Sequence, residues 1–293
     1  MYRALLAFFC FTSQLLFAAA YDEIVDYIDD TVDEYPQIVE KFELTRNDMN
    51  ETIWGVRIAS PHASTNAKEV LVVGVHHGNE RLSAEVAVSF INQAVSDILS
   101  RQRSFLSSDT IYHVIPVLNI NGYNNNERRE KVSFSSSLDP NRDYPDPCGG
   151  GYLQLRSTNA LANYLRSSNI VGAVTIHGYI GTFTFPWGTY TSETQTHDHE
   201  KFIEMAHAAA EVNNYRIGTH ADEIYPTAGV FEDWAYHEMG IWVSLIELNY
   251  STDIARDAAS IMTYFEHVPD TRSNDHNHLG DCRRVWGPII ARP

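Results

Sequence analysis

The chain has 293 residues, with 21 Lys or Arg against 38 Asp or Glu, and its formal net charge at pH 7 is −17. This acidic balance argues against nucleic acid as a partner, because nucleic-acid binding depends on a basic surface. The chain contains no internal repeat and no low-complexity linker of the kind that separates domains. We therefore expect one compact α/β unit, whose length lies within the range for a single domain.

The first twenty residues have the pattern of a secretory signal peptide. Arg3 precedes an apolar run from Leu5 to Phe17, and residues 18–20 are alanines. The run is shorter than the stretch of about 20 residues that spans a membrane, and no later run reaches that length. We predict a signal peptide at 1–20 and one domain at 21–293, secreted and without a membrane span. A buried N-terminal helix is the alternative, and a periplasmic or lysosomal location stays open.

Strands and helices are expected to alternate along the mature chain. Residues 21–40 are acidic with apolar residues at helical spacing, which predicts an amphipathic helix packed on the domain. Four apolar runs predict buried strands: Val70–Val75, Ile111–Leu118, Val171–Ile176 and Trp242–Leu248. Helical patterns cover Ser83–Leu99, Leu153–Ser167, Glu200–Asn213 and Asp253–His267. Alternation of this kind predicts a parallel or mixed sheet with helices on both faces.

Two of the three cysteines remain after removal of the signal peptide. Cys10 is lost with it, and Cys148 and Cys282 form an even pair. In an oxidising compartment such a pair favours a disulfide. We predict a Cys148–Cys282 bridge between the loop after Asn141-Arg142 and the C-terminal tail.

Polar residues follow the predicted strands where those strands end. His77 and Glu80 follow the first run, His177 follows the third, and Glu247 lies near the end of the fourth. Ligands of open α/β sheets bind at the carboxyl ends of the strands. Two imidazoles and a carboxylate are a ligand set for catalytic Zn²⁺, which keeps a fourth position for water. We therefore predict one zinc ion held by His77, Glu80 and His177.

Other histidines compete with this assignment. His76 is four residues from Glu80, and we assign it to packing or to supporting the ligands. The remaining candidates lie in polar loops, where we expect solvated side chains or weak surface metal binding: His197, His199, His276 and His278.

Five motifs in order resemble the M14-type zinc metallocarboxypeptidases, the carboxypeptidase A and B group. They are VHHGNE, VLNINGY, DPNRDYP, TIHGY with FPWG, and YPTAGVFEDWAY with LIELN, spread from about Ile53 to His267. The resemblance implies a single α/β domain on a mixed, mostly parallel, eight-stranded twisted sheet flanked by helices. It also implies a hydrolase that removes C-terminal residues from peptides or proteins.

The resemblance assigns roles to further residues. The zinc ligands fall on His77, Glu80 and His177, and the general base falls on Glu247, a carboxylate that can accept a proton from a zinc-activated water. Asn141 and Arg142 match the clamp for the substrate carboxylate, for which a planar arginine fork is suited. Either Arg128 or Arg129 would polarise the scissile carbonyl, and Arg128 is slightly favoured.

Two residues are assigned to substrate recognition. Tyr225 stands 22 residues before Glu247 and matches the family's capping tyrosine, with Tyr236 as the alternative. Glu232 takes the position that selects the C-terminal side chain, where an acidic residue favours Lys or Arg. Glu232 as a surface charge in the loop is equally compatible with the sequence. The bulky Val230 and Leu245 would narrow the pocket.

Two other functions stay open at this point. One is a related zinc amidohydrolase acting on acylated amino acids or cell-wall peptides, and the other is a non-catalytic zinc or peptide-binding module. The tyrosine segment and the Glu247 motif favour the peptidase, and no ligand or base is missing from the pattern. The oligomeric state is not encoded, and we take a monomer as the default.

Overall fold

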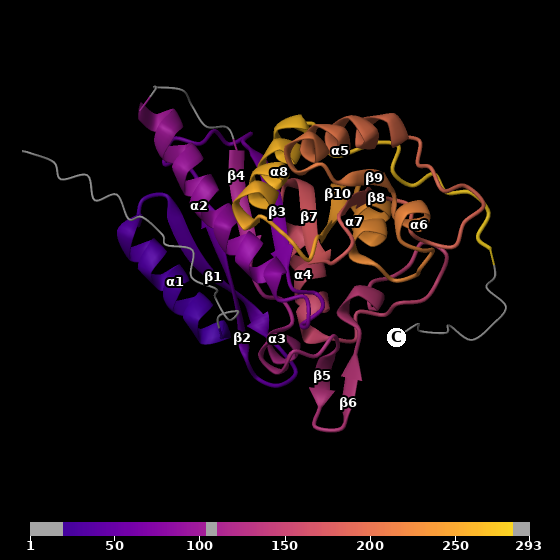
Figure 1. Cartoon of the computed structure of the whole chain (residues 1–293), viewed down its shortest axis with the longest axis horizontal. Helices are drawn as coiled ribbons and strands as arrows, with labels where there is room; N and C mark the ends of the chain where they lie inside the picture. The colour runs from indigo at the N-terminus through magenta and orange to yellow at the C-terminus, as the bar shows by residue number, and fades with distance from the viewer. Residues whose placement is uncertain (1–19, 104–109, 284–293) are drawn as a thin grey trace, which may run out of the picture.

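The structure is a computed structural model that describes residues 20–103 and 110–283 (Figure 1). The predicted signal peptide therefore lies outside the described residues, apart from Ala20. Within the described ranges, no helix combines the length and the apolarity needed to cross a membrane.

The described chain begins with helix α1 (Tyr21–Glu34), which is shorter than the predicted helix over residues 21–40. The residue before a proline is disfavoured in the α conformation, and Pro36 follows Tyr35 directly, so the helix cannot continue. Strand β1 (Val39–Arg46) then pairs antiparallel with β2 (Thr52–Ile58). The end of the predicted helix is therefore part of a strand.

The four predicted strands are all present and lie next to one another. They are β3 (Lys68–Gly74), β4 (Thr110–Ile115), β7 (Ile170–Gly178) and β10 (Trp242–Leu248). They run parallel in the order β4-β3-β7-β10. Strand β4 stops at Ile115 instead of the predicted Leu118, because Pro116 has no N–H to continue the ladder.

Further strands at both edges extend this parallel centre to eight strands, through antiparallel pairing with β4 and β10. The full order is β1-β2-β4-β3-β7-β10-β8-β9, where β8 spans Thr182–Phe185 and β9 spans Arg216–Thr219. The sheet is thus mixed and mostly parallel, which confirms the predicted fold class. A separate hairpin of β5 (Glu130–Ser133) and β6 (Ser136–Leu138) projects from one end of the molecule (Figure 1).

Helices cover both faces of the sheet. On one face α2 (Leu82–Arg103) packs against α8 (Ile254–His267), which also contacts α5 (His199–Asn213). On the other face α4 (Arg156–Ser167) and α7 (Phe231–Met239) are joined by an ion pair between Arg166 and Glu238. Short elements complete the chain: α3 (Ile120–Asn125), a 3₁₀ turn (Pro140–Arg142) and α6 (His220–Glu223).

The α4 helix begins three residues later than predicted. The carboxylate of Asp143 accepts hydrogen bonds from the backbone N–H groups of Gln154 and Leu155, both at 2.9 Å. Leu155 keeps an extended conformation as the N-cap, so the first helical residue is Arg156. A distant carboxylate, which local propensity does not reveal, therefore sets this boundary.

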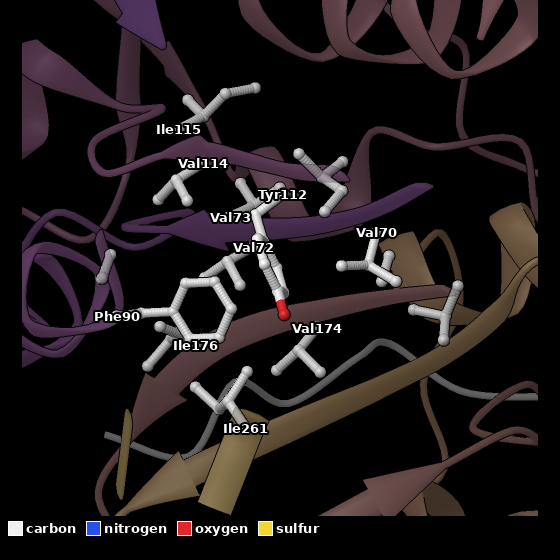
Figure 2. Close-up of a cluster of buried hydrophobic side chains, with 14 of the residues drawn as sticks. Val70, Val72, Val73, Phe90, Tyr112, Val114, Ile115, Val174, Ile176 and Ile261 are labelled. Atoms are coloured by element: carbon white, nitrogen blue, oxygen red, sulfur yellow. The ribbon is translucent and has the colours of Figure 1, made fainter. Parts of the chain in front are cut away.

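The main hydrophobic core lies between the parallel strands and the α2–α8 layer. Figure 2 shows Phe90 of α2 and Ile261 of α8 next to Val174 and Ile176 of β7. All four side chains are fully buried, and each contributes roughly 1.5–3 kcal/mol of hydrophobic stabilisation. This packing fixes the strands whose carboxyl ends carry the polar residues.

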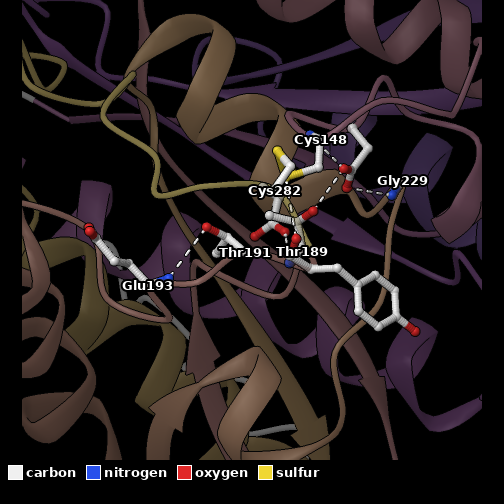
Figure 3. The surroundings of a disulfide bond; sticks show 9 residues. Cys148, Thr189, Thr191, Glu193, Gly229 and Cys282 are labelled. Carbon is white, nitrogen blue, oxygen red and sulfur yellow. Dashed lines mark hydrogen bonds between the residues drawn. A yellow bond between two sulfur atoms is a disulfide. The ribbon is translucent and has the colours of Figure 1, made fainter. Parts of the chain in front are cut away.

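The predicted disulfide between Cys148 and Cys282 is present, with the two Cα atoms 5.4 Å apart (Figure 3). Cys282 also forms an isolated antiparallel bridge with Thr191. The loop after Arg142 is thereby attached to the C-terminal segment, as predicted.

Candidate metal centre and active site

The parallel strands bring the predicted polar residues to one edge of the sheet. Strand β3 ends at Gly74 just before His76 and His77, while His177 and Glu247 lie near the ends of β7 and β10. His177 and Glu247 are direct partners in the parallel register of these two strands. Residues that are 170 positions apart in the sequence are therefore neighbours in space.

The turn after β3 has an unusual backbone conformation. Val75 has a φ of 55°, in the left-handed region that a β-branched residue rarely adopts. The N–H of Val75 donates a hydrogen bond to the Ser83 hydroxyl at 3.1 Å. The Val75 carbonyl accepts one from the N–H of Asn119 at 3.0 Å. Strained conformations of this kind concentrate at functional sites, where the surrounding structure holds them.

His77, Glu80 and His177 form a buried cluster whose potential ligand atoms face one another. The Nδ1 atom of His77 lies 2.9 Å from Glu80 Oε1, and the Nδ1 atom of His177 lies 2.9 Å from Glu80 Oε2. The two Nδ1 atoms are 3.0 Å apart. Three donors from two distant segments therefore surround one point.

This donor set fits zinc. Zn²⁺ binds imidazole nitrogen and carboxylate oxygen at about 2.0–2.2 Å, so ligand atoms around one ion lie roughly 3 Å from each other. Within residues 20–103 and 110–283, this is the one group of three or more His, Cys, Asp or Glu side chains close enough to hold a metal. The residues present thus match the predicted cofactor.

Charge in the cluster also favours a cation. Burial acts to raise the pKa of Glu80, but the two adjacent imidazoles outweigh burial and leave the pKa lowered. Burial lowers the pKa of His177, so its neutral, metal-binding form is favoured. An ionised carboxylate and a neutral imidazole are the forms that bind zinc.

His76 does not join the cluster. Its ring is fully buried, with Nε2 at 3.0 Å from the Tyr144 hydroxyl and Nδ1 at 2.8 Å from the Thr175 hydroxyl. The ring stacks on His177 with 5.5 Å between centroids. This packing corresponds to the supporting role expected from the sequence.

Asp139 is part of the site, although the sequence analysis did not assign it a role. Its Oδ1 atom lies 3.0 Å from Nε2 of His77, and its Oδ2 atom accepts a hydrogen bond from Arg128 Nε at 2.9 Å. A proton on His77 Nε2 that is donated to Asp139 leaves Nδ1 free as a ligand. The only signal in the sequence was its place two residues before Asn141.

The two arginines considered for carbonyl polarisation have different positions. Besides its bond to Asp139, Arg128 has one guanidinium nitrogen 3.6 Å from Glu80 Oε1. Arg129 instead donates to the backbone carbonyl of Ser137 within the β5–β6 hairpin. The structure therefore brings Arg128, and not Arg129, to the metal cluster.

Glu247 is partly buried at the end of β10 and has no role in the ligand cluster. Burial, together with the negative charge of Glu80, raises the pKa of Glu247 to about 8. A bound divalent cation would lower that pKa. A carboxylate next to the metal position but outside the ligand set is suited to accept and return a proton.

Asn141, Arg142 and Tyr225 lie together beside the cluster. The Asn141 side-chain nitrogen is 3.5 Å from His177 Nε2, while its side-chain oxygen accepts a hydrogen bond from the N–H of Phe231 at 2.8 Å. Arg142 donates to the Tyr225 hydroxyl at 2.9 Å. Tyr225 is half exposed, so the arginine lies at the solvent side of the site under an aromatic cover.

Glu232 and Tyr236, both on α7, are fully buried. The alternative that Glu232 is a surface charge is therefore wrong. The Tyr236 hydroxyl donates to Asp198 at 2.7 Å, so Tyr236 packs in the core and Tyr225 remains the candidate at the site. The buried position of Glu232 follows from α7 packing onto the sheet, which the loop-like composition of the sequence did not indicate.

The expectation of fully solvated loop histidines is only partly correct. His197 and His278 are exposed and stack on each other with 3.5 Å between ring centroids. His199 and His276 are half buried, since His199 is the first residue of α5 and His276 lies 2.8 Å from the His237 carbonyl. Helix packing explains the difference for both.

The sequence is similar to that of known carboxypeptidases. A family model described as zinc carboxypeptidase matches residues 24–264. Carboxypeptidase O of Bos taurus is 27% identical over 260 residues, an alignment that covers 75% of this chain and 66% of that protein. Carboxypeptidase B of Astacus astacus is 23% identical over 255 residues, covering 75% and 82% of the two chains. The chain thus spans about two thirds of the length of carboxypeptidase O.

Solved structures show the same fold. Thrombin activatable fibrinolysis inhibitor superposes with a TM-score of 0.75 at 17% identity, covering 86% of this chain and 74% of that one. Carboxypeptidase A of Helicoverpa armigera gives a TM-score of 0.73 at 15% identity, with 85% and 72% covered. The family match extends over most of the sequence and includes the whole metal cluster. This chain therefore belongs to the zinc carboxypeptidase family, peptidase family M14.

Proposed function

We propose that this protein is a zinc-dependent exopeptidase that hydrolyses the C-terminal peptide bond of peptides or proteins. The observation that carries the proposal is the convergence of the His77, Glu80 and His177 ligand atoms at a strand end where Glu247 is the direct register partner of His177. Family membership supports the same reaction.

In this proposal His77, Glu80 and His177 hold the zinc ion, and Asp139 orients His77. When bound, zinc supplies Lewis acidity that activates a water and polarises a carbonyl. Glu247 accepts the proton of the attacking water and returns it to the leaving amine. Arg128, which faces Glu80 across 3.6 Å, donates to the oxygen that becomes negatively charged.

The free carboxylate of the substrate would bind to Arg142 and Asn141. A guanidinium fork binds a carboxylate through two parallel hydrogen bonds. Arg142 now donates to the Tyr225 hydroxyl, and a substrate carboxylate would take that place and bring the half-exposed Tyr225 over the ligand. The clamp limits hydrolysis to the last residue, because an internal peptide bond offers it no carboxylate.

Glu232 supports a preference for C-terminal Lys or Arg. It is a buried carboxylate with a lowered pKa: burial acts to raise the pKa, and His220 lowers it by more. We also propose that residues 21–293 form one catalytic domain, secreted after removal of residues 1–20 and active as a monomer on peptide or protein C-termini.

The test uses zinc-loaded protein and matched peptides that end in a free carboxylate or in an amide. We expect release of the last residue from the free peptide only, loss of activity with a chelator and recovery with Zn²⁺. Glu247→Gln should retain zinc, measured by metal analysis, and lose roughly 100- to 10,000-fold in kcat. Equal cleavage of the amidated peptide, or normal activity of Glu247→Gln, would contradict the proposal.

A further inference from the structure

Glu232 does not stand alone, because a second buried titratable side chain contacts it. The Nδ1 atom of His220 lies 2.7 Å from Glu232 Oε1, and the side chains are 4% and 0% exposed. The two groups are in close contact, although they are not aligned for a hydrogen bond. Among the described residues, no atom forms a hydrogen bond with either carboxylate oxygen or either ring nitrogen.

Buried polar atoms without a hydrogen-bond partner are rare in folded proteins, and such atoms occur at functional sites. Here His220 Nε2 and Glu232 Oε2 lie outside the 2.7 Å contact and have no hydrogen-bond partner, so they can offer a donor and an acceptor to an incoming side chain. The pair can therefore take part in recognition of a substrate side chain.

The pair lies beside the groups assigned to substrate binding. The His220 ring meets the Tyr225 ring edge to face with 6.2 Å between centroids, and Tyr225 accepts a hydrogen bond from Arg142. Phe231, next to Glu232 in α7, donates its N–H to Asn141. A substrate whose carboxylate is held by Arg142 and Asn141 therefore begins its last side chain close to this pair.

The backbone holds His220 firmly in position. A Cβ atom on Gly188 would lie 3.0 Å from Cγ of His220, so the ring occupies the space that a side chain would fill. The N–H of Ala221 donates to the Trp187 carbonyl at 3.1 Å, and the N–H of Thr227 donates to the Gly188 carbonyl at 2.7 Å. The ring cannot move away from Glu232 without disturbing this loop.

We propose that His220 is a specificity residue, which occupies one oxygen of Glu232 and so weakens the selection of C-terminal Lys or Arg over neutral side chains. This inference rests on the proposed function and concerns the same site. A lone buried carboxylate would require a cationic substrate side chain for compensation. With His220 in contact, the carboxylate already has a partner, and a neutral side chain can be accepted as well.

The test compares peptides that differ only in a last residue of Lys, Arg, Leu or Phe. For the wild-type protein we expect the ratio of kcat/KM for Lys over Leu to stay below about tenfold. His220→Asn removes the ionisable ring and keeps a donor, and should raise the ratio at least tenfold. Glu232→Gln should bring the ratio to one or lower, and His220→Asn should have no further effect on it in the double variant.

A matched control separates specificity from the loss of a buried pair. His113 on β4 also contacts a carboxylate, that of the partly exposed Glu69 at 3.1 Å, but it lies within the sheet opposite Leu71. His113→Asn should leave the Lys-to-Leu ratio unchanged. If His220→Asn does not fold, His220→Gln provides the same removal of the ring with a longer side chain.

Binding provides a readout that does not depend on turnover. Calorimetry measures the affinities of the same peptides for zinc-loaded Glu247→Gln, with and without His220→Asn. The ratio of affinities for the Lys peptide over the Leu peptide should rise with His220→Asn, as the kcat/KM ratio does. Peptides that bind with this change but are not hydrolysed by the wild type would contradict the proposed function alone. A ratio that His220→Asn changes by less than twofold, or that changes equally without Glu232, would overturn the inference.

Discussion

The metal cluster and a set of buried aspartates on the substrate side use carboxylates in opposite ways. In the cluster, the Glu80 carboxylate lies against the side chains of His77, His177 and Arg128. In the second region, Asp143, Asp146 and Asp233 accept hydrogen bonds from backbone N–H groups of several loops. We call these three residues the aspartate scaffold.

The aspartate scaffold connects segments that are distant in the sequence. Asp146 accepts from the N–H groups of Cys148 at 2.8 Å and Gly229 at 3.0 Å and from the Thr189 hydroxyl at 2.7 Å (Figure 3). Asp233 accepts from the N–H groups of Gly188 and Thr189. Each carboxylate thereby satisfies donors that would otherwise be buried without a partner.

This difference implies that the metal cluster serves metal binding and the aspartate scaffold serves the stability of the fold. The ligand atoms face one another 3.0 Å apart, so they contribute to the free energy of folding mainly when a metal ion is bound. Carboxylates bound to backbone N–H groups stabilise the fold at all times. Substitutions in the two regions should therefore affect different measurements.

The largest effect is expected from His177→Gln, which removes one ligand and preserves most of the volume. Zinc sites with four ligands bind with about 10–16 kcal/mol, so one ligand corresponds to roughly 3–4 kcal/mol, or a 100- to 1,000-fold loss of affinity. The free energy of unfolding of the metal-free protein should change by about 1 kcal/mol or less. Competition with a chelator measures the zinc affinity. A loss of metal-free stability well above 1 kcal/mol would contradict the proposed difference between the two regions.

Asp146→Ala should have the reverse result. Removal of an acceptor for three buried donors should lower the free energy of unfolding by about 3 kcal/mol. The zinc affinity should stay within about threefold of the wild type. Asp146→Asn keeps one acceptor oxygen, so its free energy of unfolding, measured by urea denaturation, should lie between those of wild type and Asp146→Ala. If both variants were as stable as wild type, the two regions would not differ in their contribution to stability.

Asp139→Asn tests a residue that combines both uses of a carboxylate, because it supports a ligand and also accepts a backbone hydrogen bond from Asn141. Loss of the carboxylate behind a ligating histidine lowers metal affinity by about 10- to 100-fold. The asparagine can still accept from the backbone, so we expect little change in stability. An unchanged zinc affinity would show that His77 does not depend on Asp139.

The last prediction concerns pH dependence and Glu130, a buried carboxylate outside both regions. The Ser157 hydroxyl donates to it at 2.6 Å, and burial raises its pKa to about 8. The protonated form is therefore favoured in the folded state, and its stabilising contribution, complete below about pH 4.5, is lost as the pH rises to about 8.

Glu130→Gln, which cannot ionise, should become more stable relative to wild type as the pH rises from 5 to 8.5, by at most about 4 kcal/mol. Denaturation at these two pH values measures the change in the difference. Ser157→Ala serves as a control, because it removes the donor without removing the titrating group. A difference that does not depend on pH would show that Glu130 ionises normally.

The sequence predicts the metal cluster well because its position depends on the most regular part of the chain. Val70–Val75 and Val171–Ile176 are short apolar runs that favour buried strands, and the carboxyl ends of parallel strands share an edge. His77 and His177 follow from that geometry. The prediction required only the existence of the strands, and errors of a few residues at their ends, as at Ile115, did not affect it.

The role of Asp139 could not be read from the sequence. An aspartate before Pro140 is typical of the start of a helical turn, and Asp139 does accept from the N–H of Asn141 in that way. Its second contact, with His77, depends on how two loops meet. The contact between Glu232 and His220 could not be predicted either. It joins two short helices at 2.7 Å, and local sequence patterns do not show how those helices pack.

The hairpin and the edge strands were also absent from the individual predictions. Strand β1 has the sequence VEKFELTR and is largely half exposed, so it has no apolar run to detect. Strands β5 and β6 contain only four and three residues. The total of eight strands came from the family resemblance, and the structure supplied their positions.

The pairing of Glu247 with His177 has a consequence for how this protein can change. Both residues lie on neighbouring strands of the central sheet, so their separation is fixed by main-chain hydrogen bonds at a spacing of about 4.8 Å between strands. Tyr225, His220 and Glu232 lie instead on the segment from β9 to α7, which enters the site from outside this ladder. Segments from related enzymes could therefore be exchanged between residues 216 and 239 to alter selectivity while the reacting groups keep their alignment.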